Sequence, residues 1–415
     1  MTAPTWHTPG VTDPHAHPDE KSRPRPGSTA GQRRRTSRLR VAVVGTGMIG
    51  GVHLRSARAA GAEVVGVLAS APERSQAAAQ RWQVGVAYPD FDAILSDDSI
   101  DVVHVCTPNF LHVTQAIGAL RAGKHVVCEK PVATSAADAL ALADAAATSG
   151  LVATVPFVYR YHPMVRELRA RVLAGDFGPW QLLHGSYLQD WLLTPESTSW
   201  RVDPAAGGSS RAFADIGGHW FDLVEWVAGV QVAEVLAETT TTVAERPVAA
   251  GPSFSRSSEP GSARAPVTTE DAVGVLGRTT GGVLVCATIS QVSAGRKNRL
   301  WLELDGADAS GVFDQELPES LWLGYSNRTE TVVRDPSANV PDAARLSIVP
   351  AGHPQGYLEC FENFLKDTYA AIRGEQPAGL PTVLDGVRSA QLVDAVLASA
   401  NQRRWTAVPD SEERG

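Results

Sequence analysis

The segment Gly45-Thr46-Gly47-Met48-Ile49-Gly50 directly follows the apolar run 41–44 and opens a helical pattern. A short continuous apolar run is typical of a strand buried on both faces. After such a strand, the first glycine permits a tight turn, the second lets the main chain approach a pyrophosphate, and the third lets helix and strand pack closely. The helix N-terminus adds free N–H groups that bind phosphate. These six residues are therefore predicted to bind a dinucleotide; the alternative is a plain glycine turn.

Strand and helix patterns alternate from residue 38 to residue 157. The apolar runs 63–68, 101–106 and 125–128 are each followed by a helical pattern. Regular alternation of this kind is typical of a parallel sheet with helices on both faces. We therefore predict an α/β fold that begins with a doubly wound Rossmann domain over residues 38–157.

The alternation ends after residue 157. Strand patterns then follow with few helices between them, at 180–187, 234–242, 271–278, 283–292 and 300–305. Gly281-Gly282 reads as a hairpin turn between two of them. This predicts a C-terminal α/β domain, residues 158–380, with an open, largely antiparallel sheet. A helical pattern over 381–407 closes the chain, and we expect it to pack back on the body.

Two segments differ in composition from the rest. Residues 1–37 are rich in Pro, Gly, Ser and Arg, and residues 243–268 are rich in Pro, Ser and Gly. Segments of this composition bury too little apolar area to order themselves, so a disordered tail and a mobile insertion are predicted. Arg33 to Arg35 precede an apolar stretch, as in a twin-arginine export signal. That stretch serves better as the first core strand, which argues against export.

Bulk properties exclude several classes of protein. The formal net charge of −8 argues against a nucleic-acid binder, which needs basic surface for phosphates. No apolar run approaches the ~20 residues that span a bilayer. The four cysteines show no C-x-x-C spacing and suit free thiols in a reducing compartment. We expect a cytoplasmic protein whose partner is a small molecule, with no nucleic acid and no membrane.

The residues at the end of the second predicted strand indicate the choice between NAD and NADP. An acidic residue that binds the ribose is expected there, about 20 residues after the glycine loop. The sequence instead has Ala69 and Ser70, with Arg74 nearby. An acid would repel a 2′-phosphate, whereas Arg74 could pair with it. Ser70 and Arg74 are thus candidate cofactor residues, and the pattern favours NADP; the alternative for Arg74 is a solvated helix residue.

Two further motifs carry groups suited to catalysis. Cys128-Glu129-Lys130-Pro131 lies at the C-terminal end of a predicted strand, where ligands bind in open α/β sheets. Asp215 and His219 are four apart, so on a helix they share one face. A histidine beside a carboxylate can act as a general acid or base near neutral pH. The alternatives are a solvated surface lysine, an N-capping Asp215 and a core His219.

A metal site is not predicted. It would need a third ligand beside Asp215 and His219, and the other histidines show no ligand spacing: His104, His112, His125 and His184.

Taken together, the motifs resemble the Gfo/Idh/MocA oxidoreductase family over about residues 39–404. The resemblance is carried by the glycine loop, by Thr107-Pro108-Asn109 with His112, by Glu129-Lys130-Pro131 and by the Asp215…His219 spacing. It implies a Rossmann domain with NAD(P) and a C-terminal domain whose open sheet often mediates oligomers. It also implies that Lys130, Asp215 and His219 line the site beside the nicotinamide, that the other motif residues bind the cofactor, and that the Lys130–Pro131 bond is cis.

Within that family, several segments are similar to members that oxidise or reduce sugar rings. They are the aromatic-rich run 187–191, Trp200-Arg201 and the run 353–357. Flat tryptophan rings suit the C–H faces of pyranoses or cyclic polyols, although core packing is the alternative. The candidate substrate residues are Trp191, Trp200, Arg201, Trp220, His353 and Tyr357.

The expected reaction is hydride transfer between the nicotinamide and a secondary alcohol or ketone of a sugar or cyclic polyol. His219 would act as base or acid, Lys130 would stabilise charge on the reacting oxygen, and Asp215 would bind substrate or orient His219. One alternative is a glycoside-cleaving enzyme that oxidises a ring carbon transiently. Another is a non-catalytic regulator that binds NAD(P) or sugar. An exposed open sheet favours a homodimer or homotetramer.

Overall fold

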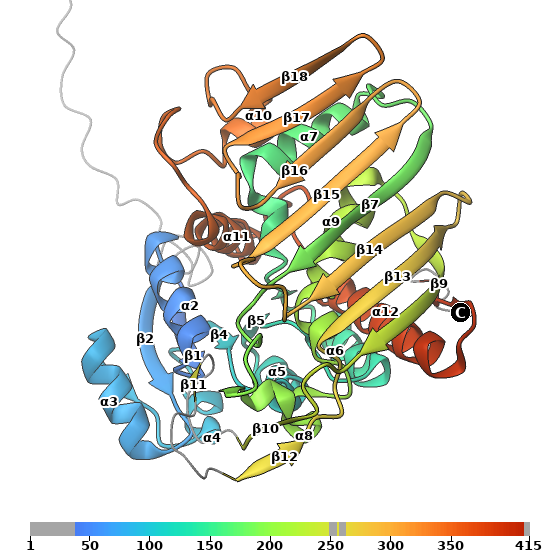
Figure 1. Cartoon of the computed structure of the whole chain (residues 1–415). Coiled ribbons are helices and arrows are strands. Elements are labelled where there is room, and N and C mark those ends of the chain that lie inside the picture. The colour runs from blue at the N-terminus through green and yellow to red at the C-terminus, as the bar shows by residue number, and fades with distance from the viewer. Residues whose placement is uncertain (1–37, 249–254, 257–262, 411–415) are drawn as a thin grey trace, which may run out of the picture. The chain divides into compact units, whose positions relative to one another are not determined.

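The computed structural model describes residues 38–248, 255–256 and 263–410, so the predicted tail over residues 1–37 lies outside the described residues. The first sheet has six parallel strands in the order β3-β2-β1-β4-β5-β6 (Figure 1). Their bounds are β1 Arg40–Val44, β2 Glu63–Leu68, β3 Val86–Ala87, β4 Val102–Val105, β5 His125–Cys128 and β6 Ala153–Thr154. The strand order reverses direction beside β1, as in a doubly wound sheet.

Both faces of this sheet are covered, which explains its continuous apolar strands. Val41 and Val43 join a core cluster with α2 (Met48–Ala59) and α3 (Pro72–Trp82). Ala42 and Val44 point the other way, into a cluster with α5 (His112–Arg121) and α6 (Ala136–Ser149). Successive residues of one strand therefore serve two helical layers, and the predicted Rossmann fold is confirmed.

The second sheet has nine strands in the order β18-β17-β16-β15-β7-β14-β13-β9-β19. Its pairs are antiparallel except for β14 with β7, so the prediction of a largely antiparallel sheet is confirmed. The bounds are β7 Trp180–Leu188, β9 Val232–Thr240, β13 Ala272–Thr279, β14 Leu284–Ser290, β15 Arg299–Gly306, β16 Ser310–Asp314, β17 Ser320–Tyr325, β18 Arg328–Val333 and β19 Thr406–Ala407. β16, β17 and β18 were not expected from the sequence.

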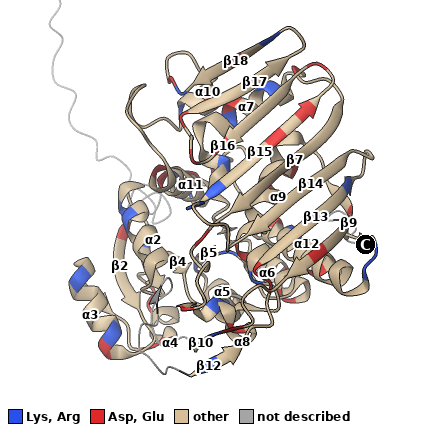
Figure 2. Ribbon diagram, in the orientation of Figure 1, with Lys and Arg blue, Asp and Glu red and all other residues tan. Residues whose placement is uncertain are grey.

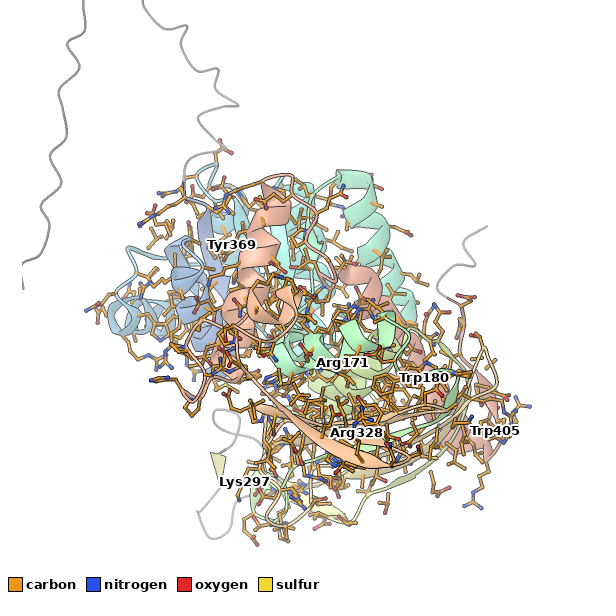
Figure 3. The ribbon with its side chains drawn as sticks, turned by 90° about the horizontal axis from the view of Figure 1, so that it is seen from above. Arg171, Trp180, Lys297, Arg328, Tyr369 and Trp405 are labelled. Atoms are coloured by element: carbon orange, nitrogen blue, oxygen red, sulfur yellow. The ribbon has the colours of Figure 1, made fainter. Side chains whose placement is uncertain are left out.

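In the part of the chain that the structure describes, helices cover one face of the second sheet only. Helices α7 (Pro163–Leu173), α9 (Gly218–Ala228) and α12 (Val383–Gln402) share a core cluster with its inner residues. Seen from above in Figure 3, these helices lie on one side of the curved sheet. Side chains on the outer face are exposed: Leu276, Leu284 and Trp322. An alternating buried and exposed pattern, clearest in β13, follows from this one-sided cover.

The last two long helices return to the first sheet. Helix α11 (Tyr357–Ile372) packs against α2, and α12 packs against both α6 and β9. None of the helices in the described part of the chain has the length and apolar character needed to cross a bilayer.

The segment 243–268 is partly ordered. β10 (Glu245–Pro247) pairs with β12 (Arg264–Pro266), and β11 (Ser255–Arg256) pairs with β8 (Ser197–Thr198). Arg246 is buried and donates to the carbonyl oxygen of Leu192 at 2.7 Å. The expectation of a wholly mobile insertion is corrected, because this buried arginine and the strand pairing fix both ends. Residues 249–254 and 257–262 lie outside the described residues.

Candidate active site

The glycine loop joins β1 to α2 and leaves open space above the helix. Gly45 has φ +99°, and a Cβ there would lie 2.3 Å from the Cys106 carbonyl oxygen. At Gly50 a Cβ would lie 2.0 Å from the carbonyl oxygen of Gly45, so side chains are excluded at both positions. Among the described residues, nothing lies within 4 Å of the Cβ position at Gly47, and no side chain caps α2. The loop therefore fits a pyrophosphate on a free helix N-terminus.

Ser70 and Arg74 lie together just beyond β2, at the start of α3. The Arg74 guanidinium is exposed and donates to Ser70 Oγ at 3.2 Å. Neither residue supplies a carboxylate for a ribose. Contact of Ser70 and Arg74 with the dinucleotide stays a prediction.

The Thr107-Pro108-Asn109 segment follows β4 and is held by buried contacts. The His112 ring nitrogens lie 2.7 Å from the Pro131 carbonyl oxygen and 2.8 Å from that of Thr107. The Asn109 amide donates to the Gly207 carbonyl at 2.8 Å. Both side chains are buried, so His112 and Asn109 fix the loops that carry Thr107 and Pro131. Contact of these two side chains with the cofactor stays a prediction.

Lys130 reaches from the end of β5 to the C-terminal domain. Its ammonium donates to Asp215 twice, at 2.8 Å to Oδ1 and at 2.7 Å to the main-chain carbonyl. The Lys130–Pro131 bond is cis, as the resemblance implied. Lys130 is thus a partly buried cation tied to a carboxylate rather than a solvated surface lysine.

Asp215 lies in a π-helical turn, η4 (Phe213–Gly217), that runs into α9. Such turns are rare and are often found at functional sites. Oδ2 accepts from the buried Gln291 amide at 2.8 Å, and Arg201 Nε lies 3.5 Å from Oδ1. Burial would raise the pKa of Asp215, but Lys130 and Arg201 together hold it well below the ordinary value. The group is therefore a carboxylate whose oxygens are already engaged.

His219 is buried one turn further along, on α9. Its ring packs edge-on against Tyr159, with centroids 4.9 Å apart, and Nδ1 has no hydrogen-bond partner in the described part of the chain. Burial and the Lys130 charge hold the pKa of His219 well below its ordinary value. A neutral imidazole with a free nitrogen is suited to accept a proton.

These groups line one cavity of about 400 Å³ between the glycine loop and the second sheet. Several predicted residues reach it: Met48, Ile49, Glu129, Lys130, Trp191, Arg201, Asp215, His219 and Tyr357. The rest of the wall includes residues that the sequence analysis did not name individually: Tyr159, Tyr187, Gln189, Asp190, Lys297, Asn298 and Phe361. Tyr187 and Gln189 fall within the aromatic-rich run 187–191, which was the only signal for them.

A polar ladder runs along this wall. Trp191 Nε1 donates to Gln189 Oε1 at 2.8 Å, and the Gln189 amide donates to Asn298 Oδ1 at 2.7 Å. Tyr187 donates to the same Asn298 oxygen at 2.7 Å, and its hydroxyl also bonds that of Tyr159. The ladder offers a row of fixed hydroxyl and amide groups, which is the lining that a polyhydroxylated ligand requires.

Three candidate substrate residues do not line the cavity. Trp220 is fully buried and donates to the Trp301 carbonyl at 2.9 Å, so it belongs to the core under the second sheet. His353 is exposed, and its carbonyl accepts from Arg334 at 2.6 Å. Trp200 stacks under the Arg201 guanidinium, 4.5 Å from ring centroid to Cζ, and so supports Arg201. Trp220 and His353 therefore lie outside the cavity that the other predicted residues line.

His184 is not isolated, contrary to the expectation from its spacing. It lies on β7 with Nε2 at 3.3 Å from Asp305 and 3.7 Å from Glu303, both on β15, whose acidic positions are red in Figure 2. Among the described residues this is the one group of three metal-ligating side chains with donor atoms within 4.8 Å. It lies on the outer face of the second sheet, and none of its members lines the cavity.

Comparison with known proteins supports both halves of the fold. A family model described as "Oxidoreductase family, NAD-binding Rossmann fold" matches residues 39–157, and "GFO/IDH/MocA C-terminal domain" matches residues 165–311. A levoglucosan dehydrogenase from Pseudarthrobacter phenanthrenivorans is 31% identical over 348 residues, which are 81% of this chain and 87% of that protein.

Solved structures show the same arrangement. An oxidoreductase domain protein from Kribbella flavida superposes with a TM-score of 0.82 at 31% identity, over 90% of this chain and 100% of that one. Levoglucosan dehydrogenase in complex with NADH and L-sorbose superposes with a TM-score of 0.81 at 29% identity, over 90% and 99% of the two chains.

Proposed function

The chain belongs to the Gfo/Idh/MocA family and is an NAD(P)-dependent oxidoreductase of sugars or polyols, and we propose that Lys130, Asp215 and His219 carry out its proton chemistry. The observation that carries the proposal is their convergence in one cavity beside the glycine loop. Lys130 and Asp215 are joined directly, and His219 is neutral with a ring nitrogen that has no partner among the described residues. These are the groups that a hydroxyl-to-carbonyl conversion needs.

The cofactor site fits a dinucleotide through the open space at Gly47 and the uncapped end of α2. When bound, the nicotinamide supplies the acceptor or donor of hydride. His219 takes the proton of the reacting hydroxyl, and Lys130 donates a hydrogen bond to the oxygen as negative charge develops on it. Asp215 holds Lys130 in place, because its oxygens are engaged by Lys130 and Gln291 rather than by His219. This differs from the expected role of orienting His219.

We propose an anhydrosugar or pyranose as the substrate. The relatives named above act on levoglucosan or bind L-sorbose. In this chain the cavity of about 400 Å³ offers the polar ladder from Trp191 to Tyr159 on one side and Arg201 on the other. Trp191 adds an apolar ring face for C–H groups, and the ladder supplies partners for ring hydroxyls.

The experiment is to follow absorbance of the reduced nicotinamide with purified protein, NAD or NADP, and a panel of anhydrosugars, pyranoses and inositols. Cofactor reduction with the wild type and its loss in His219→Gln supports the proposal. Cleavage of a glycoside without net cofactor change would support the redox-assisted glycosidase instead. Tight dinucleotide binding without turnover in either direction would support the regulator.

We propose that NADP is preferred over NAD. The support is the exposed Arg74 guanidinium beside Ser70 and the absence of an acid at the end of β2. Arginine binds phosphate through paired N–H donors. The preference is tested by comparing the dissociation constants of NADP and NAD.

We also propose a homodimer or homotetramer that assembles through the uncovered face of the second sheet. Leu276 is 42% exposed and Leu284 43% exposed on neighbouring strands of that face. Large apolar side chains grouped on an open sheet favour association. Light scattering on wild type and Leu276→Asp tests this: the wild type is expected to be oligomeric and the variant to dissociate. A cytoplasmic location stays a prediction, supported by four free cysteines.

A further inference from the structure

A chain of four buried polar side chains leads from α11 to the cavity. Tyr369 on α11 lies 3.2 Å from His104 on β4, measured from its hydroxyl to Nε2. His104 Nδ1 lies 3.1 Å from Nδ1 of His53 on α2, and His53 Nε2 lies 2.9 Å from Glu129 Oε1. Tyr369, His104 and His53 are fully buried, and Glu129 is 5% exposed. Glu129 is the one member of this chain that lines the cavity.

The donors and acceptors of this chain allow one direction when Glu129 is a carboxylate and both imidazoles are neutral. Glu129 can only accept, so His53 Nε2–H donates to it and His53 Nδ1 accepts. His104 must then donate from Nδ1–H and accept at Nε2, where the Tyr369 hydroxyl donates. Each of the imidazole nitrogens in this row then has a hydrogen-bond partner. The other Glu129 oxygen accepts from the main-chain N–H of Lys130 at 3.1 Å.

The reverse direction requires a proton on Glu129. Each hydrogen bond would then point away from the cavity and end on the Tyr369 oxygen. Burial would raise the pKa of Glu129, but its hydrogen bond to His53, with Lys130 nearby, holds that pKa below the ordinary value and opposes the reverse direction. Burial holds the pKa of His104 well below its ordinary value, so His104 stays neutral and relays hydrogen-bond direction rather than charge.

We propose that Tyr369, His104 and His53 are positioning residues that keep Glu129 ionised, and that this carboxylate sets the ratio of affinities for oxidised and reduced dinucleotide. Oxidised nicotinamide carries a positive charge and reduced nicotinamide does not. A fixed carboxylate in the cavity wall therefore stabilises the oxidised form selectively. The inference rests on the proposed function, since it takes the cavity as the site of the nicotinamide end.

A purely structural role would act differently. His53 packs against Phe361, with ring centroids 5.2 Å apart, and it is not among the residues that line the cavity, whereas Phe361 is. Loss of packing there would weaken both cofactor forms together. Reversal of the hydrogen bonds between Tyr369 and Glu129 changes the charge of Glu129, and so weakens binding of the oxidised dinucleotide more than that of the reduced one.

The test measures dissociation constants of oxidised and reduced dinucleotide by calorimetry for wild type, Glu129→Gln and Tyr369→Phe. Glu129→Gln is expected to weaken the oxidised form about tenfold and to leave the reduced form nearly unchanged. Tyr369→Phe removes one oxygen and is expected to act in the same direction by a few-fold. Tyr161→Phe is the matched control, because it removes the hydroxyl of an equally buried tyrosine that is not part of the hydrogen-bonded row from Tyr369 to Glu129. Its ratio of dissociation constants for oxidised and reduced dinucleotide should equal that of wild type.

Equal weakening of both forms in Glu129→Gln and Tyr369→Phe, or an unchanged ratio, overturns the inference while the proposed function stands. Failure of wild type to bind any dinucleotide overturns the proposed function itself. Nitrogen NMR of imidazole-labelled wild type gives a second test that needs no variant. His104 protonated at Nδ1 and His53 protonated at Nε2 is the expected result, and the opposite tautomers contradict the proposal.

Discussion

Lys130 donates to both the side-chain and the main-chain oxygen of Asp215, at 2.8 Å and 2.7 Å. Two contacts to one residue fix the ammonium at the junction between the end of β5 and the turn η4. The two motifs are 85 residues apart in sequence, and this pair is the point where they become one site.

Lys130→Met removes this donor while keeping much of its length. We expect kcat to fall about 10²–10³-fold, as for loss of one donor to a developing oxyanion. Steady-state kinetics measure it, with Lys366→Met as the control, since Lys366 is half-exposed on α11 and pairs only with Glu362 in the described part of the chain. Activity near that of wild type would rule out the assigned role.

The pH profile of alcohol oxidation reports on His219. Because burial and Lys130 lower its pKa well below 6.5, the imidazole is already neutral at and below pH 6.5. We expect no loss of kcat/KM as the pH falls from 8 through 6.5, and His219→Gln should slow the reaction about 10²–10⁴-fold. An acid limb centred near pH 6.5 that disappears in the variant would contradict this.

His162 makes the fold sensitive to acid. Burial lowers the pKa of His162 to about 4, and its Nε2 has no hydrogen-bond partner in the described part of the chain. The unfolded chain takes up the proton near pH 6.5 and the folded chain only near pH 4, so stability is lost as the pH falls between these values. The loss amounts to about 3 kcal/mol when complete.

Urea unfolding of wild type and His162→Leu across this pH range measures the effect. The variant should lose less stability between pH 6.5 and pH 4 than wild type does. His353→Leu is the control, because His353 is exposed. Parallel curves for wild type and His162→Leu would show that His162 does not carry the sensitivity.

Arg74→Ala tests the preference for NADP. The guanidinium is exposed beside Ser70, so its removal should not disturb the core. We expect the dissociation constant of NADP to rise about tenfold and that of NAD to change little, because only NADP has the 2′-phosphate. Equal effects on the two dissociation constants would show that Arg74 does not bind the 2′-phosphate.

The sequence was most informative where the structure is local. The glycine loop, the strand before it and α2 are adjacent in the chain, so their spacing alone predicts their geometry. Asp215 and His219 were also found, although the π-helical turn that carries Asp215 leaves no periodicity in the sequence. The two-sided burial of β1 likewise followed from its unbroken apolar run.

Non-local contacts could not be predicted from the sequence. The polar ladder joins Tyr159, Tyr187 and Asn298, and Tyr159 and Asn298 are 139 residues apart. Tryptophan is a residue type suited to sugar binding, so Trp220 was a candidate. Its packing under the second sheet depends on β15, which is distant in sequence and passes beside it. Strands β16 to β18 were missed because they are only five or six residues long, and β18 is polar over most of its length.

Helix α12 contacts α6 under the first sheet and β9 in the second. A single rigid helix shared by two layers resists any rotation of one sheet against the other, since such a rotation would shear its packing on at least one side. Substrate entry and product release are therefore expected to depend on side chains and loops at the cavity mouth, among them the half-exposed Trp191 and the exposed Lys297, and not on a hinge between the two sheets. Turnover in this enzyme would then be limited by local gating rather than by domain closure.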